Sequence, residues 1–153
     1  MDTAKILTLL DEAYKNEVTA IHQYMSHHYT MDAMGYKGIA SNEKKFAVEE
    51  MKHAEKLGER ILFYDGSPSE KPGPEIRKGG DLKKMLKDDL DLEVGAVEMY
   101  QRVIAEMAAL GDFTSKRLLE SLLADEEDHV DFFRTELEKI ERLGDAYLAT
   151  LAK

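Results

Sequence analysis

Two glutamates and one histidine in the first half of the chain are matched by identical residues in the second half, at one constant offset. The offset is 76 positions, and it relates Glu17 to Glu93, Glu50 to Glu126 and His53 to His129. The neighbouring residues repeat as well, because residues 17–24 (EVTAIHQY) resemble residues 93–100 (EVGAVEMY). Chance is an alternative, since 31 of the 153 residues are acidic, but the chain contains only 5 histidines. The repeat predicts two helix pairs, each carrying half of one site.

Glycine and proline divide the chain into four long segments of helix-favouring composition. We expect the first helix to close at Gly35 and Gly38, and the second to be capped by Ser41 or Asn42. The remaining boundaries are expected at Asp65-Gly66, at the cap Asp81, at Gly111-Asp112 and at Gly144-Asp145. Each long helix would span about 25 to 30 residues, or roughly 40 Å at about 1.5 Å per residue.

Residues 66–80 contain Pro68, Pro72 and Pro74 together with four glycines, so this segment is not expected to be helical. A connection of this length inside a domain suggests a crossover along a bundle. Apolar stripes on each helix predict one buried core, with Leu86, Val94 and Val97 in the third helix. The predicted fold is all-α: a single domain over residues 1–153, with four bundled helices, one long crossover and a short C-terminal fifth helix.

Composition narrows the classes of partner and site. The net charge of −10 disfavours nucleic acid, which is bound through basic patches, and favours cations, although the charge could serve solubility alone. The absence of cysteine excludes thiolate-ligated zinc and iron–sulfur centres. No apolar run long enough for a membrane span and no leader segment is found, so we expect a cytoplasmic protein without membrane contact.

The repeated residues suit a pair of divalent metals. Residues three apart lie on one helix face, so Glu50 points with His53, and Glu126 points with His129. Four carboxylates carry a formal charge of −4, which two divalent cations balance. Oxygen-rich ligation with one imidazole per metal favours iron or manganese, although zinc can also bind such a site. Two ferrous ions with open positions could be oxidised by O₂ or H₂O₂.

The sequence resembles the bacterioferritins along nearly its whole length, and residues 49–56 (EEMKHAEK) and 59–63 (ERILF) are especially similar. The resemblance implies a ferritin-like fold, and a ferroxidase that stores and detoxifies iron as ferric mineral in a shell of 24 subunits built from two-fold dimers. It also implies two Fe ions per subunit. Glu17 and His53 would be terminal ligands of one ion, Glu93 and His129 of the other, and Glu50 and Glu126 would bridge them. The tail with Tyr147, Leu148 and Leu151 would form four-fold contacts, or simply cap the bundle.

Met51 is implied as a haem ligand by the same resemblance, because two copies of this methionine hold one haem b between paired subunits. One residue after Glu50, Met51 points away from the metal face, with Ala47, Ala54 and Gly58 on adjoining turns. Glycine inside a helix suggests that something approaches Gly58 closely. The alternative is a methionine that packs an interface without any cofactor.

Two tyrosines could support the metal ligands. Tyr24 and Tyr100 each lie seven residues beyond Glu17 or Glu93, and each could donate a hydrogen bond to the glutamate of the antiparallel partner helix. Packing alone is the alternative for Tyr100. His22 and His27 are expected at the solvent or at an interface.

The sequence departs from some bacterioferritins at Lys45 and Phe46, where those relatives carry a histidine and an acidic residue on the iron route. Only Glu49 keeps an acidic group there, which leaves the route of iron, and its status as transit ion or fixed cofactor, open. A di-iron peroxidase or oxygenase without a shell is the alternative function. A structural helical interaction protein is a third possibility, and it would not explain glutamates in register with histidines.

Overall fold

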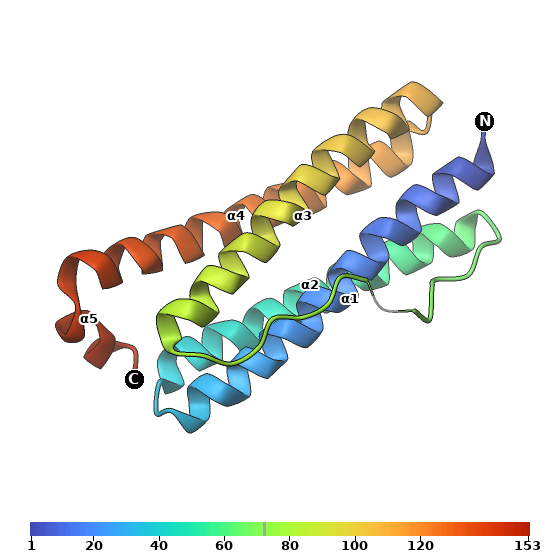
Figure 1. Ribbon diagram of the computed structural model, residues 1–153. Coiled ribbons are helices and arrows are strands. Elements are labelled where there is room, and N and C mark those ends of the chain that lie inside the picture. Colours follow the sequence, from blue (N-terminus) through green and yellow to red (C-terminus); the bar gives the residue numbers. More distant parts are fainter. Residues whose placement is uncertain (72) are drawn as a thin grey trace.

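The computed structural model describes residues 1–71 and 73–153, so Pro72 of the expected crossover lies outside the described residues. Four long helices and one short helix follow one another: α1 (Thr3–Ala33), α2 (Lys37–Phe63), α3 (Leu82–Leu110), α4 (Phe113–Leu143) and α5 (Asp145–Thr150). Figure 1 shows α1 beside α2 and α3 beside α4, with the crossover returning along the bundle. The described residues contain no strand, which confirms the all-α prediction.

Side-chain caps start three of the long helices. Asp2 accepts a hydrogen bond from Lys5 N at 3.0 Å, Asp81 from Lys84 N at 2.8 Å, and Asp112 from Ser115 N at 3.0 Å. Gly111 ends α3 in the left-handed conformation with φ 82°. The expected boundaries at Asp81 and at Gly111-Asp112 are confirmed.

The predicted start of the second helix is wrong. Helix α2 begins at Lys37, preceded by Tyr36 without a side-chain cap, so Ser41 and Asn42 lie inside it. Gly38 is a helical residue and does not close α1. A Cβ atom at Gly38 would collide with the carbonyl oxygen of Lys153, so this glycine makes room for the end of the chain.

The C-terminal tail packs on its own subunit. Leu151 O accepts hydrogen bonds from Gly38 N at 3.1 Å and from Ile39 N at 3.4 Å. The Tyr147 hydroxyl donates to Glu136 on α4. Tyr147, Leu148 and Leu151 also pack against the core at this end of the bundle. The tail therefore caps the bundle within one subunit, and its expected role at a four-fold axis stays a prediction.

Hydrogen bonds fasten the crossover to α1. Thr19 Oγ1 donates to Pro74 O at 2.8 Å, Ser69 N donates to Asp11 Oδ1 at 2.8 Å, and Arg77 N donates to Gln23 Oε1 at 3.0 Å. These hydrogen bonds hold the crossover against α1, which explains why a segment without helix follows a defined path along the bundle in Figure 1.

Two apolar layers enclose a polar middle. One layer contains Leu9, Leu57, Val103 and Leu122, and the other contains Met31, Ile39, Leu86 and Phe133. The glutamates at 17, 50, 93 and 126 fall between these layers on their four helices and are buried. Val94, expected in the core, is 38% exposed.

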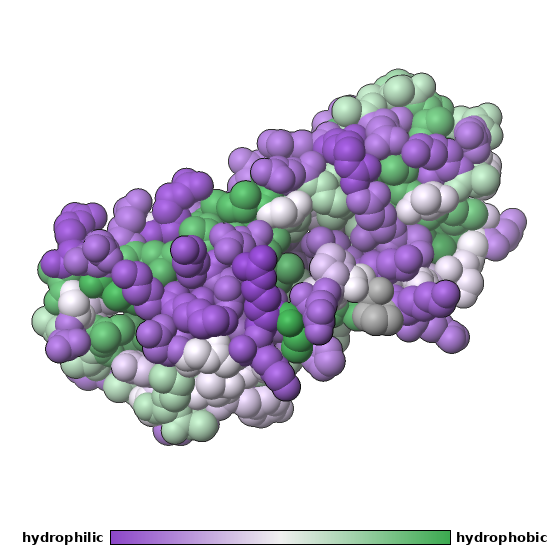
Figure 2. Space-filling model, viewed as in Figure 1, coloured by the Kyte–Doolittle hydropathy of each residue, from purple (hydrophilic) through white to green (hydrophobic). Residues whose placement is uncertain are grey.

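Polar side chains cover much of the face seen in Figure 2, with scattered apolar patches between them. None of the helices formed by the described residues combines the length and apolar character needed to cross a lipid bilayer.

Candidate metal centre

The six side chains expected to bind metal converge in the middle of the bundle. Glu17 comes from α1, Glu50 and His53 from α2, Glu93 from α3, and Glu126 and His129 from α4. None is more than 3% exposed. Each helix pair therefore supplies two carboxylates and one imidazole, as the 76-residue repeat predicts.

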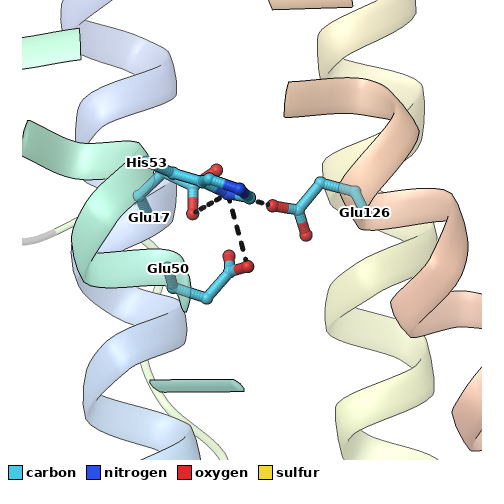
Figure 3. A group of neighbouring side chains, drawn as sticks. All are labelled: Glu17, Glu50, His53 and Glu126. Carbon is cyan, nitrogen blue, oxygen red and sulfur yellow. Dashed lines mark hydrogen bonds and ion pairs between the residues drawn. The ribbon is translucent and has the colours of Figure 1, made fainter. Parts of the chain in front are cut away.

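These residues form two groups that share members. Glu17, Glu50, His53 and Glu126 offer ligand atoms that lie within 4.8 Å of one another, as do Glu50, Glu93, Glu126 and His129. In the first group, drawn in Figure 3, His53 Nδ1 lies 2.9 Å from Glu126 Oε1 and 3.5 Å from Glu50 Oε1. In the second, His129 Nδ1 lies 3.2 Å from Glu50 Oε1. Glu50 and Glu126 belong to both groups, which is the arrangement expected of bridging ligands.

The centre contains buried polar atoms without a hydrogen-bond partner among the described residues. Among the described residues, buried side-chain atoms without a hydrogen-bond partner occur on Glu17, Glu50, Glu93, Glu126 and His129, and otherwise only on Glu43. Buried polar atoms are normally paired, because losing water without a replacement partner costs free energy. Atoms left open around one point are suited to coordinating cations.

Proton affinities in the centre reflect the crowding of acidic groups. Burial raises the pKa of Glu17, Glu50 and Glu93, and the neighbouring carboxylates raise it further. Burial would also raise the pKa of Glu126, but hydrogen bonds involving Glu93, His129 and His53 hold it well below its usual value. Without metal, the carboxyl groups therefore differ in proton affinity.

The two imidazoles hold protons tightly. Burial by itself would lower the pKa of His53, but hydrogen bonds to Glu126 and Glu17 raise it to about 10. For His129 the nearby carboxylates of Glu126 and Glu93, 3.6 Å and 3.5 Å from Nδ1, outweigh burial and raise the pKa to about 11. Cations entering the centre must displace these protons, because a protonated imidazole nitrogen has no lone pair to donate.

Sequence reasoning did not identify the partners of the outer histidine nitrogens. His53 Nε2 lies 2.9 Å from Asp125 Oδ2, and His129 Nε2 lies 2.6 Å from Glu49 Oε2. Carboxylates at this position commonly orient metal-binding imidazoles. The repeat could have revealed both, since Glu49 and Asp125 are themselves 76 positions apart.

Both tyrosines make the hydrogen bonds expected across the helix pair. The Tyr24 hydroxyl on α1 donates to Glu93 on α3, and the Tyr100 hydroxyl on α3 donates to Glu17 on α1. Both tyrosines are fully buried. Glu17 belongs only to the first ligand group and Glu93 only to the second, and one of these hydroxyls restrains each of them.

A surface cavity of about 440 Å³ reaches the outer side of both histidines. Phe46 packs against the His129 ring with centroids 4.5 Å apart and forms one wall, whereas Lys45 is exposed and does not line the cavity. The acidic wall consists of Glu49, Asp125 and Asp128, and Lys52 and Lys56 lie at the same opening. A cation can therefore approach the centre past these three carboxylates, although Phe46 offers no oxygen ligand on this route.

Met51 is half exposed and lines a groove of about 410 Å³ on the α1–α2 face. The groove also contains Ala54 and Gly58, as expected, but Ala47 is buried in the core instead. Among the described residues outside its own helix backbone, a Cβ atom added at Gly58 would meet Pro68 Cγ at 3.7 Å and Tyr14 Cε2 at 3.8 Å, which is ordinary van der Waals contact. The close approach expected at Gly58 is therefore not present within the subunit.

One histidine lies where sequence reasoning did not expect it. His22 is exposed, as expected, but His27 is completely buried within the subunit beside Asp89. The error arose because the repeat places no histidine or acidic residue at the position matching His27, which is occupied by Val103.

Comparisons with known proteins agree with this geometry. Residues 7–143 match the ferritin-like domain family. A bacterioferritin of Desulfovibrio desulfuricans is 34% identical over 149 residues, covering 97% of this chain and 83% of the relative. Bacterioferritins of Brucella melitensis and Streptomyces coelicolor are each 36% identical, covering 92% and 96% of this chain and 88% and 89% of the relatives.

Proposed function

Since this chain belongs to the bacterioferritins, within the ferritin-like family, we propose that it stores and detoxifies iron by oxidising Fe²⁺ to Fe³⁺ at the buried centre. The observation that carries the proposal is the pair of ligand groups sharing Glu50 and Glu126. Two ions placed there would each meet one imidazole and three carboxylates. Their summed charge would balance the formal charge of the four glutamates, which removes the electrostatic cost of burying them.

The residues have distinct tasks in this proposal. Glu17 with His53 binds one ferrous ion, Glu93 with His129 binds the other, and Glu50 and Glu126 bridge both. Tyr100 and Tyr24 hold the two terminal glutamates in place. Glu49 and Asp125 fix the outer nitrogens of the imidazoles, so that the inner Nδ1 atoms face the ions.

The oxidation moves two electrons per pair of ions. Two Fe²⁺ become two Fe³⁺, and O₂ with two protons becomes H₂O₂; alternatively, H₂O₂ with two protons becomes two water molecules. Ferrous ions would reach the centre through the cavity lined by Glu49, Asp125 and Asp128, whose carboxylates attract cations.

Haem and shell assembly complete the proposal. Met51 lies half exposed beside a groove that a second subunit could close, so that two Met51 side chains would hold one haem b across a two-fold axis. Such dimers would build the shell of 24 subunits, each subunit being one ferritin-like domain over residues 1–153. A cytoplasmic location stays a prediction.

Replacing a shared ligand tests the centre. We expect Glu126→Ala to slow ferrous oxidation by at least about tenfold, because both ions lose a ligand. The rate is measured from the near-ultraviolet absorbance of the ferric product, and circular dichroism checks that the helices persist. Glu127→Ala is the matched control, since its side chain is exposed on the next position of α4. An unchanged rate in Glu126→Ala would remove Glu126 from the centre.

A further inference from the structure

A third group of potential ligands lies at the end of the bundle where α1 ends and α3 begins. His27, Glu43 and Asp89 are completely buried, and each offers a ligand atom within 4.8 Å of the others. His27 Nδ1 lies 2.8 Å from Asp89 Oδ1. Within the part of the chain that the structure describes, neither carboxylate oxygen of Glu43 has a hydrogen-bond partner. The group shares no residue with the proposed iron centre.

The proton of His27 can be placed from its surroundings. His27 Nε2 lies 2.8 Å from the carbonyl oxygen of Arg77, which can only accept a hydrogen bond, so Nε2 carries a hydrogen. Nδ1 lies 2.8 Å from Asp89 Oδ1, so a cation bound there would take the place of a hydrogen between these two atoms. Histidines that bind metals through one nitrogen usually donate the other N–H to a carbonyl or carboxylate. His27 is therefore oriented as a metal ligand.

Asp89 is also held in position from outside the group. Gln23 Nε2 donates to Asp89 Oδ1 at 2.9 Å, while Gln23 Oε1 accepts from Arg77 N at 3.0 Å. One residue of the crossover, Arg77, thus fixes His27 directly and Asp89 through Gln23. Glu43 is the member without any such partner, and its open oxygens face the other two.

The repeat shows that the bundle does not need polar residues in this layer. At the offset of 76 positions, His27 corresponds to Val103, Glu43 to Leu119 and Asp89 to Ala13. These three counterparts are completely buried and lie together in one apolar cluster at the opposite end. Apolar side chains fill the equivalent layer, so burying two carboxylates here costs free energy that the fold does not require.

We propose that His27, Glu43 and Asp89 form a third metal site, which binds one divalent transition-metal ion. One imidazole nitrogen with carboxylate oxygens suits Fe²⁺, Mn²⁺ or Zn²⁺, and the charge of the ion balances the two carboxylates. Asp89 lies four residues before Glu93, about 6 Å along the axis of α3. Tyr24, which donates to Glu93, is on the same helix as His27 and less than one turn from it. In the iron-loaded protein the site would hold a third ferrous ion beside the oxidising pair.

Zinc is the probe, because it binds such ligands and is not oxidised. Crystals of the metal-free protein soaked in Zn²⁺ are expected to show an anomalous difference peak bounded by His27 Nδ1, Glu43 and Asp89. Desalted Glu43→Gln protein should retain one Zn²⁺ fewer per subunit than wild type. Glu138→Gln, an exposed glutamate on α4, is the matched control and should retain the wild-type number.

The outcomes separate this site from the iron centre. Glu126→Ala should lose Zn²⁺ at the centre and keep the peak at His27, because the two sites share no ligand. A wild-type map without a peak at His27 would overturn the proposal. A peak that persists in Glu43→Gln would overturn it as well. If Glu43→Gln does not fold, the wild-type map decides.

Discussion

Single residues outside the six proposed ligands decide how the imidazoles face the centre. Glu49 and Asp125 hold the Nε2 atoms of His129 and His53, so the Nδ1 atoms point inward. Both carboxylates line the cavity that leads to the centre. Each therefore has two roles, orienting a ligand and meeting incoming cations.

Neutralising these two carboxylates should weaken metal binding. We expect Glu49→Gln with Asp125→Asn to lower the affinity for Zn²⁺ by about 10- to 100-fold, because the imidazoles lose their negatively charged acceptors. Isothermal titration calorimetry measures the affinity. Asp128→Asn, at the same opening, is the control for a general loss of negative charge. Equal weakening in the control would assign the effect to charge alone.

The histidine protons make metal binding dependent on pH. With the pKa of His53 near 10 and that of His129 near 11, both imidazoles are protonated at pH 7 in the metal-free protein. Bound ions require neutral imidazoles, so we expect at least about two protons to be released per pair of ions and the affinity to rise with pH. A Zn²⁺ titration in weakly buffered indicator measures the release. Binding at pH 7 without any release would mean that both imidazoles are already neutral before metal binds.

At the scale of helices, the C-terminal tail lies against the turn between α1 and α2 (Figure 1). Gly35 adopts φ 91° in this turn, and Gly38 lies in the first turn of α2 under the C-terminal tail. The tail and α2 meet through backbone hydrogen bonds from Gly38 and Ile39 to Leu151. The absence of a side chain at Gly38 is what permits this contact.

Two glycine substitutions should therefore have opposite effects. Gly38→Ala is expected to detach residues 151–153, because its Cβ atom would collide with the backbone of Lys153. Gly95→Ala, in the middle of α3, should raise the stability by about 1 kcal/mol, because among the described residues no atom beyond its chain neighbours and the backbone of its own helix lies within 4 Å of the added Cβ. Thermal unfolding and limited proteolysis of the tail measure both effects. A tail equally protected in Gly38→Ala would argue against the contact.

At the scale of the whole molecule, the α1–α2 face is the candidate for subunit pairing. Met51 and Leu62 line its groove and are 50% and 61% exposed. Apolar side chains left in water along one groove are typical of surfaces covered in an assembly. The same face would therefore carry both the proposed haem site and the proposed contact between paired subunits.

Particle size and a visible spectrum test the assembly together. Twenty-four subunits of 17.4 kDa would form a particle of about 420 kDa, and we expect that mass by light scattering, with the absorption of a bis-methionine haem. Met51→Leu should remove the haem absorption, whereas Met34→Leu, which is also exposed, should keep it. A metal-binding dimer without haem would instead favour the di-iron peroxidase or oxygenase.

The sequence predicted the parts of the molecule that depend on local or repeated patterns. Caps at Asp81 and Asp112, the four long helices and the convergence of two Glu-x-x-His faces all follow from spacing along the chain. The start of α2 was missed because the distant tail accepts hydrogen bonds from its first turn, at Gly38 and Ile39. His27 was misplaced because its partners Glu43 and Asp89 come from other helices and lie outside the repeat.

The sequence by itself thus determined the helices, their apolar faces and the matched sets of ligands, because each is written at helical spacing or at the offset of 76 positions. Resemblance to the bacterioferritins had already implied that Glu50 and Glu126 are shared, and the tertiary structure places both in the two groups. Only the tertiary structure decided how the imidazoles are turned and that a further buried cluster exists. Those features depend on distances between side chains of different helices. Such distances are set by packing and burial, which spacing along the chain does not encode.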